Sequence, residues 1–382
     1  MALAPSRLEP IFSPRPWGVR SLAPLFPEKS NLAEPLGEAW MTGNDCRFAT
    51  GQFAGQTLGD AWPKMSPDWK GTAAQPAAVF PLLVKFIFAD EKLSVQVHPD
   101  DAYASRHEAA AGGKGKTEMW YVLSARDGAS VLAGLKPSVT RDAFQRAIAD
   151  GTAEDCLESV PMRPGESIFI PAGTAHTIGA GLVLCEVQQH SDLTYRVYDY
   201  NRRDAQGKSR ELHIEKALEV MRFGPQTCRK LDPVRVPGAP GKMEGSAAQE
   251  LRNEILVACP YFATERWQFD APVAASSSPE HFELLIFLEG QGSIQWKGAE
   301  AAYGPAQVWL IPAALGEFRL APSALSGAGS SPAPLPSAGA SEASGGATTL
   351  LRTYVPPSLD ALSRELTRAG LSPAVTQSLI HR

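Results

Sequence analysis

Short apolar runs that each end in a turn signal recur between residues 79 and 200, and they constrain the fold more than any other feature. In residues 93–98 apolar and polar side chains alternate, which is typical of a strand with two different faces. The chain also contains 33 glycines and 32 prolines, so turns are frequent and a coiled coil or helical bundle is excluded. The pattern predicts a mainly β protein built as a sandwich or barrel. Similar runs lie at residues 119–123, 130–135, 167–171, 182–188 and 195–200.

Helices and low-complexity segments divide the rest of the chain. Residues 140–149 and 211–223 have helical spacing, and a further helix is predicted from Ser358 to about Ala369, followed by a shorter one. In the tract 321–349, 26 of 29 residues are Ala, Pro, Ser, Gly or Thr, which predicts a disordered loop. We therefore expect a first domain at residues 1–225, a connector at 226–253, a second domain at 254–356 that contains the loop, and a helical tail at 357–382.

An internal repeat links the two expected domains. Residues 162–172 and 302–313 share one pattern, a turn followed by a strand and then Pro-Ala. The first copy continues to His176, whereas the second continues through residues 314–316 without a histidine. Both copies resemble the corner that precedes a metal-binding histidine in double-stranded β-helix (cupin) barrels. We therefore expect two related barrels, of which only the first holds a metal.

Charge and cysteine content bear on partners and compartment. The net charge is −5, from 36 basic and 41 acidic residues without a long basic run. This argues against nucleic acid or an anionic membrane as partner, although a local cluster of Lys and Arg could still meet a small anionic substrate. The five cysteines form no C-x-x-C pair, so a reducing cytoplasm is expected. The first residues lack an apolar leader, and the most apolar stretch, 79–89, is too short to span a bilayer.

Candidate metal ligands lie on several of the predicted strands. Ser94, Gln96 and His98 share one face of their strand, which is either exposed to solvent or lines a polar cavity. Taken alone, His176 could be a buried hydrogen-bonded imidazole, and Glu118 a charge at the edge of a strand. Together, two imidazoles, a carboxylate and an amide oxygen suit a divalent ion, zinc before others.

Cationic residues form a second group. Lys85 lies within an apolar strand, where an unpaired ammonium is costly, so it either reaches the surface or meets an anion in a cavity. Lys116 lies two residues before Glu118, and Arg196 shares a strand face with Tyr198. Lysines and an arginine near a metal fit a phosphorylated substrate.

Seven motifs follow one another along the chain: Trp17-Gly18, Gly37-Glu38-Ala39-Trp40, Leu83-Val84-Lys85, residues 93–99, residues 116–121, residues 171–176 and residues 191–200. In this order they resemble the motifs of type I mannose-6-phosphate isomerases, and most closely those of the short bacterial form. The resemblance runs from about Leu8 to Val355; the tract 321–349 and the tail after Val355 depart from it. It implies two cupin barrels with few helices and a reaction that interconverts mannose 6-phosphate and fructose 6-phosphate through a cis-enediol.

The resemblance also implies roles for individual residues. Both Glu186 and Lys116 are candidates for the general base that moves the proton between C2 and C1. The expected partner is a small sugar phosphate, and the expected assembly is a monomer or weak homodimer. Rival interpretations are another cupin metalloenzyme, such as an iron oxygenase or one acting on a phosphorylated sugar, and a non-enzymatic sugar-binding cupin. The implied roles are one zinc ion per chain held by Gln96, His98, Glu118 and His176; phosphate binding by Lys85 and Ser94; further substrate contacts from Lys116 and Asp192; and catalysis by Arg196, Lys116 and Glu186.

Overall fold

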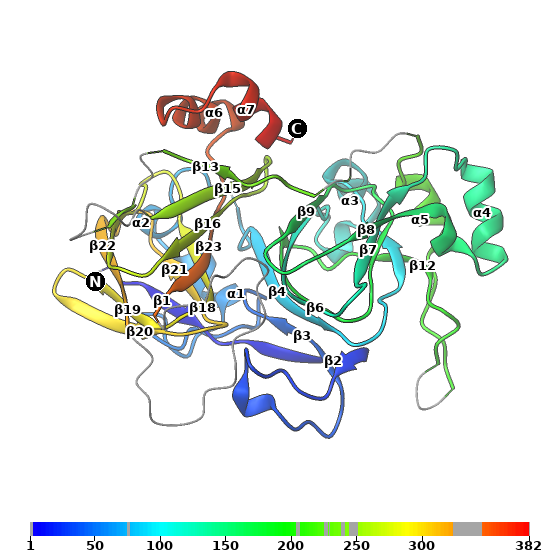
Figure 1. Ribbon diagram of the computed structural model, residues 1–382, viewed down its shortest axis with the longest axis horizontal. Coiled ribbons are helices and arrows are strands. Elements are labelled where there is room, and N and C mark those ends of the chain that lie inside the picture. Colours follow the sequence, from blue (N-terminus) through cyan, green and yellow to red (C-terminus); the bar gives the residue numbers. More distant parts are fainter. Residues whose placement is uncertain are drawn as a thin grey trace.

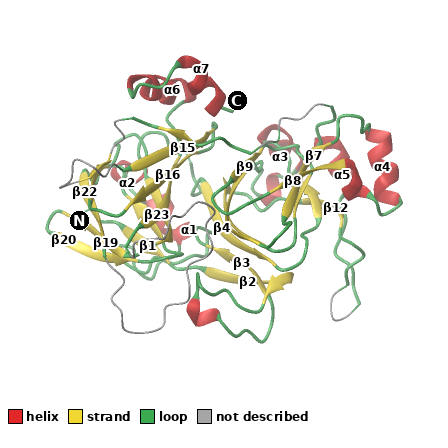
Figure 2. Ribbon diagram, in the orientation of Figure 1, coloured by secondary structure: helices red, strands yellow, loops and turns green. Residues whose placement is uncertain are grey.

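The computed structural model describes residues 3–74, 77–203, 207–224, 228, 230–237, 241–243, 251–323 and 346–381. Within these residues, strands form four sheets whose ladders are antiparallel, and the longer helices lie at the periphery (Figure 1, Figure 2). The prediction of a mainly β protein with few helices is confirmed. In the described part of the chain, no helix has the length and apolar character that crossing a membrane requires.

Two sheets come mostly from the first 200 residues, and every strand in them pairs antiparallel with its neighbours. The six-stranded sheet has the order β2 (Ile11–Val19), β3 (Leu36–Trp40), β4 (Leu82–Ala89), β11 (Leu182–Gln189), β6 (Glu118–Ala125) and β9 (Ser167–Ile170). The five-stranded sheet has the order β12 (Tyr195–Tyr198), β5 (Val95–Val97), β10 (His176–Ile178), β7 (Ser130–Leu135) and β8 (Leu157–Pro161).

The other two sheets come mostly from the second half of the chain. The seven-stranded sheet has the order β1 (Ser6–Leu8), β21 (Val308–Ile311), β18 (Glu283–Glu289), β23 (Thr348–Tyr354), β16 (Ala263–Phe269), β15 (Arg252–Ala258) and β13 (Val234–Arg235). The five-stranded sheet has the order β14 (Gly241–Met243), β17 (Val273–Ser276), β22 (Glu317–Pro322), β19 (Gly292–Trp296) and β20 (Ala299–Tyr303).

Each large sheet is buried on both faces. One face of β4 contributes Phe86 and Phe88 to an apolar cluster that also contains Leu284 and Ile286 of β18, so the six- and seven-stranded sheets pack together. The other face of β4 contributes Ile87 to a separate cluster shared with β7 and β10 of the five-stranded sheet. Side chains alternate along a strand, so Lys85 lies on this inner face, between the paired sheets of the first half. A third cluster fills the corresponding space in the second half.

Helices cover the edges of the sheets. The predicted helix at residues 140–149 is α4 (Arg141–Ala149), with Thr140 as its N-cap, and the predicted tail helices are α6 (Leu359–Arg368) and α7 (Pro373–Leu379). The helix predicted at residues 211–223 is shorter than expected, because α5 runs only from Ile214 to Val220. The remaining helices are α1 (Leu58–Ala61), α2 (Pro67–Lys70) and α3 (Asp101–His107).

Two sequence-based expectations need correction. The predicted disordered loop at residues 321–349 is too long, because its first two residues pair in β22 and its last two pair in β23. Composition alone assigned these small residues to the loop, whereas backbone hydrogen bonds to neighbouring strands keep them in the sheets. Residues 324–345 lie outside the described residues. In addition, β1 pairs with β21, so this N-terminal strand belongs to a sheet of the second half.

Candidate active site

The ends of β5 and β10 bring two histidines together. His176 lies directly opposite Gln96 in the sheet, and His98 is the residue that follows β5. The corner before β10 turns at Gly173, which has a φ of 84° and donates its N–H to the His98 carbonyl oxygen over 2.8 Å. A Cβ at this position would lie 2.9 Å from the Val220 carbonyl oxygen, so the close approach requires glycine.

Glu118, the first residue of β6, completes a buried cluster. One potential ligand atom from each of His98, Glu118 and His176 lies within 4.8 Å of the others. Glu118 Oε1 is 3.3 Å from His176 Nε2, and Glu118 Oε2 is 3.8 Å from His98 Nε2. The Gln96 side-chain amide lies 3.3 Å from His176 Nε2. The structure therefore brings together the four residues that the sequence predicts as metal ligands.

Backbone carbonyl groups fix the orientation of both imidazoles. His98 Nδ1 lies 2.7 Å from the Leu193 carbonyl oxygen, and His176 Nδ1 lies 2.9 Å from that of Thr174. A carbonyl oxygen can only accept, so each Nδ1 carries the proton and each Nε2 presents a lone pair toward Glu118. Burial holds the pKa of His98 well below its usual range and lowers the pKa of His176 to about 4. Both rings are therefore neutral near pH 7, the form that binds a metal ion.

The cluster fits a divalent metal ion. Two neutral imidazoles and a carboxylate, with a neighbouring amide, form the mixed nitrogen and oxygen donor set that zinc and related ions accept. Glu118 Oε1 is buried and has no hydrogen-bond donor in the described part of the chain, although burying such an oxygen unpaired is unfavourable. A bound cation would satisfy this oxygen. The donor types do not distinguish zinc from other divalent transition metals.

Lys116 lies against the cluster. Its Nζ atom is 2.6 Å from Glu118 Oε2, 3.1 Å from His98 Nε2 and 3.7 Å from Glu186 Oε1. Burial alone would lower the pKa of Lys116, but the two carboxylates outweigh it and raise the pKa above its ordinary value. The lysine is therefore a fixed positive charge at this place.

Lys85 connects two carboxylates on the other side of the site. Its Nζ atom lies 2.8 Å from Asp192 Oδ1, 3.9 Å from Glu186 Oε2 and 4.2 Å from the centre of the Trp40 ring. Burial opposes its charge, yet the carboxylates raise the pKa of Lys85 above its ordinary value and Lys85 in turn lowers that of Asp192. Burial raises the pKa of Glu186, whose Oε1 accepts a hydrogen bond from Trp120 Nε1 over 3.0 Å.

Arg196 of β12 lies opposite Gln96 in the sheet. Its Nε donates to Ser94 Oγ over 3.2 Å, and its Nη1 donates to the Glu211 carbonyl oxygen over 3.0 Å. Among the described residues, no carboxylate lies within 4.0 Å of this guanidinium. Burial, together with the neighbouring Arg210, lowers the pKa of Arg196. Arg196 is therefore a cation without an anionic partner, which favours binding of an anionic ligand.

A cavity of about 450 Å³ joins these groups, a size suited to a small molecule. His98, Glu118 and His176 do not line it, but Gln96 and Lys116 line it and contact them, so the cluster lies directly behind its wall. Seven of the ten predicted site residues line the cavity: Lys85, Ser94, Gln96, Lys116, Glu186, Asp192 and Arg196.

Comparisons with known proteins identify the family. A sequence model described as phosphomannose isomerase type I, catalytic domain, matches residues 7–123. The chain is 32% identical to the mannose-6-phosphate isomerase ManA of Bacillus subtilis over 84% of this chain and 96% of that protein. The chain belongs to the type I phosphomannose isomerase family. A mannose-6-phosphate isomerase from Streptococcus mutans is 39% identical over 57% of this chain and 64% of that protein. The crystal structure of the Bacillus subtilis mannose 6-phosphate isomerase matches with a TM-score of 0.73 and 26% identity, over 92% of this chain and 99% of that chain.

Four further ionisable residues line the cavity of this phosphomannose isomerase family member without having been predicted as site residues. Arg15 reaches Glu38 over 2.8 Å, and both contribute to the cavity wall. Arg210 also lines the cavity, and its Nε donates a hydrogen bond to Asp199 Oδ2 over 2.7 Å. His213 is the fourth of these residues. Glu38 lies in one of the motifs of the resemblance, but no spacing rule marks Arg15 or Arg210.

The second half of the chain repeats the strand pairing that surrounds the candidate metal cluster, but with different side chains. Glu118 pairs with Ile170, and Glu283 pairs with Ile311, in each case just before the Pro-Ala of the internal repeat. The sixth residue after Ile170 is His176, whereas the exposed Glu317 is the sixth after Ile311. In the described part of the chain, only the first half contains a group of three His, Cys, Asp or Glu ligand atoms close enough to share an ion.

An arginine occupies the second copy of this arrangement. Arg352 pairs with Leu285 on one neighbouring strand and with Glu265 on the other. Glu186 occupies the corresponding position in the first half, where it pairs with Trp120 and with Lys85. Its Nη2 lies 2.6 Å from Glu283 Oε1, and its Nη1 lies 3.0 Å from Glu265 Oε1. The buried guanidinium therefore neutralises the carboxylates in the second half, where the first half has its candidate metal site.

Proposed function

We propose that this protein interconverts mannose 6-phosphate and fructose 6-phosphate and uses one zinc ion per chain. The observation that carries the proposal is the buried cluster of His98, Glu118 and His176 directly behind a cavity lined by Arg196, a cation with no carboxylate partner among the described residues. Membership of the type I phosphomannose isomerase family supports the same reaction. The reaction is an aldose–ketose isomerisation through a cis-enediol, in which a proton leaves C2 and is delivered to C1.

Binding and orientation of the substrate are assigned to the residues of the cavity wall. Lys85 and Ser94 bind the phosphate, since both line the cavity and Lys85 holds its charge while buried. Arg196 stabilises the negative charge that develops on the substrate oxygens, and its hydrogen bond to Ser94 holds it in place. Gln96, His98, Glu118 and His176 would hold the zinc ion, which would supply Lewis-acid stabilisation of the same charge.

Glu186 is the better candidate for the general base. Its Oε1 is oriented by Trp120, and its side chain lines the cavity. Lys116 lies between the carboxylates of Glu118 and Glu186, an arrangement that favours its protonated form. We therefore assign proton abstraction to Glu186, and electrostatic stabilisation to Lys116. Asp192 positions Lys85 through their 2.8 Å ion pair.

Finer features of the fold and assembly belong to the same proposal. We infer that each pair of facing sheets is a double-stranded β-helix, or cupin, barrel. The first barrel contains the site, within a catalytic domain at residues 1–225 whose strand β1 joins a sheet of the second half. A connector at 226–253 leads to a metal-free domain at 254–356, followed by the helical tail at 357–382. A cytoplasmic monomer or weak homodimer is the expected form of the protein.

Two alternatives predict different results in a coupled assay that starts from mannose 6-phosphate, with and without a chelator. Another cupin metalloenzyme acting on a phosphorylated sugar would bind metal but form no fructose 6-phosphate. A non-enzymatic sugar-binding cupin would form none under any condition. The presence of the full residue set at one cavity favours the isomerase, which should form fructose 6-phosphate and lose activity with the chelator.

A further inference from the structure

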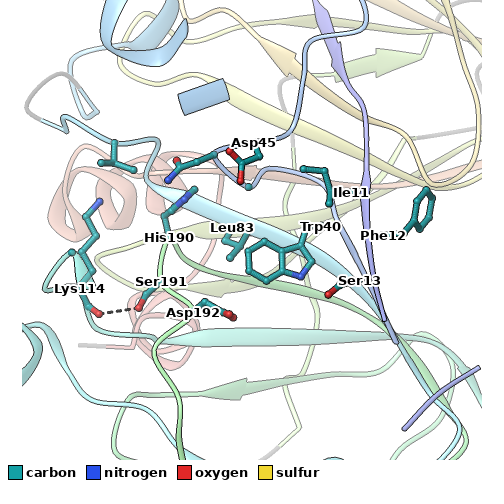
Figure 3. A pocket seen from close by; sticks show the side chains of 14 residues that line it. Ile11, Phe12, Ser13, Trp40, Asp45, Leu83, Lys114, His190, Ser191 and Asp192 are labelled. Carbon is teal, nitrogen blue, oxygen red and sulfur yellow. Dashed lines mark hydrogen bonds between the residues drawn. The ribbon is translucent and has the colours of Figure 1, made fainter. Parts of the chain in front are cut away.

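A second cavity adjoins the proposed active site. It encloses about 500 Å³, and Trp40 and Asp192 form part of its wall (Figure 3). Asp192 also lines the first cavity, where its Oδ1 holds the Lys85 ammonium over 2.8 Å. The same ammonium lies 4.2 Å from the centre of the Trp40 ring. Two side chains are thus shared between the second cavity and the immediate surroundings of Lys85.

One part of this cavity is apolar. Ile11 and Val79, which line it, are 40% and 37% exposed and are two of the three large hydrophobic residues exposed in the described part of the chain. Trp40, Phe12 and Leu83 complete this part, and Figure 3 shows the Trp40 indole in the middle of the view with Leu83 beside it. Trp40 Nε1 donates to Glu38 over 2.7 Å, so the orientation of the ring is fixed. A fixed aromatic ring beside exposed aliphatic side chains favours a ligand with an apolar face.

Another part of the cavity wall is polar. Asn44 and Asp45 are exposed, and Lys114 and His190 lie on the same wall. His190 Nδ1 donates to the Leu82 carbonyl oxygen over 3.2 Å, and burial lowers the pKa of His190 to about 4, so its Nε2 remains an acceptor near pH 7. Burial lowers the pKa of Lys114 against the opposing charge of Asp101, which does not line this cavity. The wall thus presents both donors and acceptors.

These groups narrow the chemistry of the ligand. A purely apolar ligand would displace water from Asn44, Asp45 and Lys114 without replacing its hydrogen bonds, which is unfavourable. A phosphate or carboxylate would meet Asp45 and Asp192, whose charges balance those of Lys114 and of Lys85, the ion-pair partner of Asp192, so the wall offers no net positive charge to attract it. A neutral molecule that combines hydroxyl groups with an apolar C–H face satisfies both parts of the wall. Unphosphorylated sugars have this chemistry.

We propose that this second cavity binds an unphosphorylated monosaccharide, with its C–H face on Trp40 and its hydroxyl groups toward Asn44, Asp45 and Lys114. The site is distinct from the one that binds the sugar phosphate. Asp192 and Trp40 both contact Lys85, so occupancy of the second cavity should change the KM for mannose 6-phosphate; this coupling rests on the proposed phosphate role of Lys85.

The test is titration calorimetry of the full-length protein with D-mannose, D-glucose and D-fructose. At least one sugar should bind, and Asn44→Ala and Val79→Ser should each weaken its affinity at least tenfold. Leu212→Ser removes the third exposed hydrophobic residue, which does not line this cavity, and should keep the affinity within twofold. His98→Ala disrupts the metal cluster, which does not line the second cavity, and should also leave binding intact.

The results separate this proposal from the isomerase proposal. The sugar-site proposal would be overturned by equal sugar affinity in wild type, Asn44→Ala and Val79→Ser. Loss of sugar binding in His98→Ala, or no binding of any of the three sugars to wild type, would also overturn it. Asn44→Ala should retain the kcat/KM of wild type for mannose 6-phosphate within twofold. Failure of wild type to isomerise mannose 6-phosphate would instead refute the isomerase proposal and leave the sugar titration decisive for the second cavity.

Discussion

Replacing Lys85 with methionine tests the proposed phosphate anchor. Methionine keeps an unbranched side chain against Trp40 and removes only the ammonium, which lies 4.2 Å from that ring and does not contact the metal cluster. A charge-assisted hydrogen bond contributes about 1.5–3 kcal/mol, so its loss should raise the KM for mannose 6-phosphate roughly 10- to 150-fold. The metal content should stay at one ion per chain, because none of the four candidate ligands changes.

The assay combines initial rates in the coupled system with elemental analysis of the same preparation. Lys216→Met is the matched control: it removes a lysine that is paired with Glu108 at the surface, where its side chain is 48% exposed. The control should keep the KM of the wild type. An unchanged KM in Lys85→Met, accompanied by loss of metal, would refute the assignment of Lys85 to the phosphate.

Three other substitutions test separate parts of the structure. His98→Ala removes an imidazole whose Nε2 faces Glu118, so metal analysis should show nearly complete loss of zinc, and a fully metallated, active variant would contradict the ligand assignment. Arg352→Met leaves Glu265 and Glu283 buried without their cation, and urea denaturation should show a loss of about 3–5 kcal/mol of unfolding free energy; a loss below about 1 kcal/mol would contradict this account. Burial lowers the pKa of His281 from 6.5 to about 4, so its neutral form contributes stability above pH 6.5 that is lost as the pH falls toward 4. The melting temperature of the wild type should therefore fall more steeply over this range than that of His281→Phe, and parallel curves would contradict this reasoning.

Local patterns were sufficient for most of the strands between residues 79 and 200 and for the grouping of the site residues. The alternation in residues 93–98 predicts that Gln96 and His98 share a face, and the structure places both beside His176 and Glu118. The ordered motifs carry this information because each one spans a single strand or corner. The roles of these residues as metal ligands and phosphate contacts remain predictions.

Long-range pairings could not be predicted from the same patterns. The three residues of β1 are too few to show an alternation, and their partner β21 lies about 300 residues away in the sequence. Arg15 and Arg210 reach the cavity through ion pairs with Glu38 and Asp199, which depend on the folded arrangement and not on spacing. The position of Arg352 between Glu265 and Glu283 follows from strand register, which the sequence alone does not specify.

The most direct test of the proposed function is the formation of fructose 6-phosphate from mannose 6-phosphate by the purified protein, before chelation, after chelation and after return of zinc. The account predicts formation of the ketose phosphate, loss of activity with the chelator and recovery with zinc. No ketose phosphate from the metal-loaded protein, or full activity after verified removal of the metal, would contradict it.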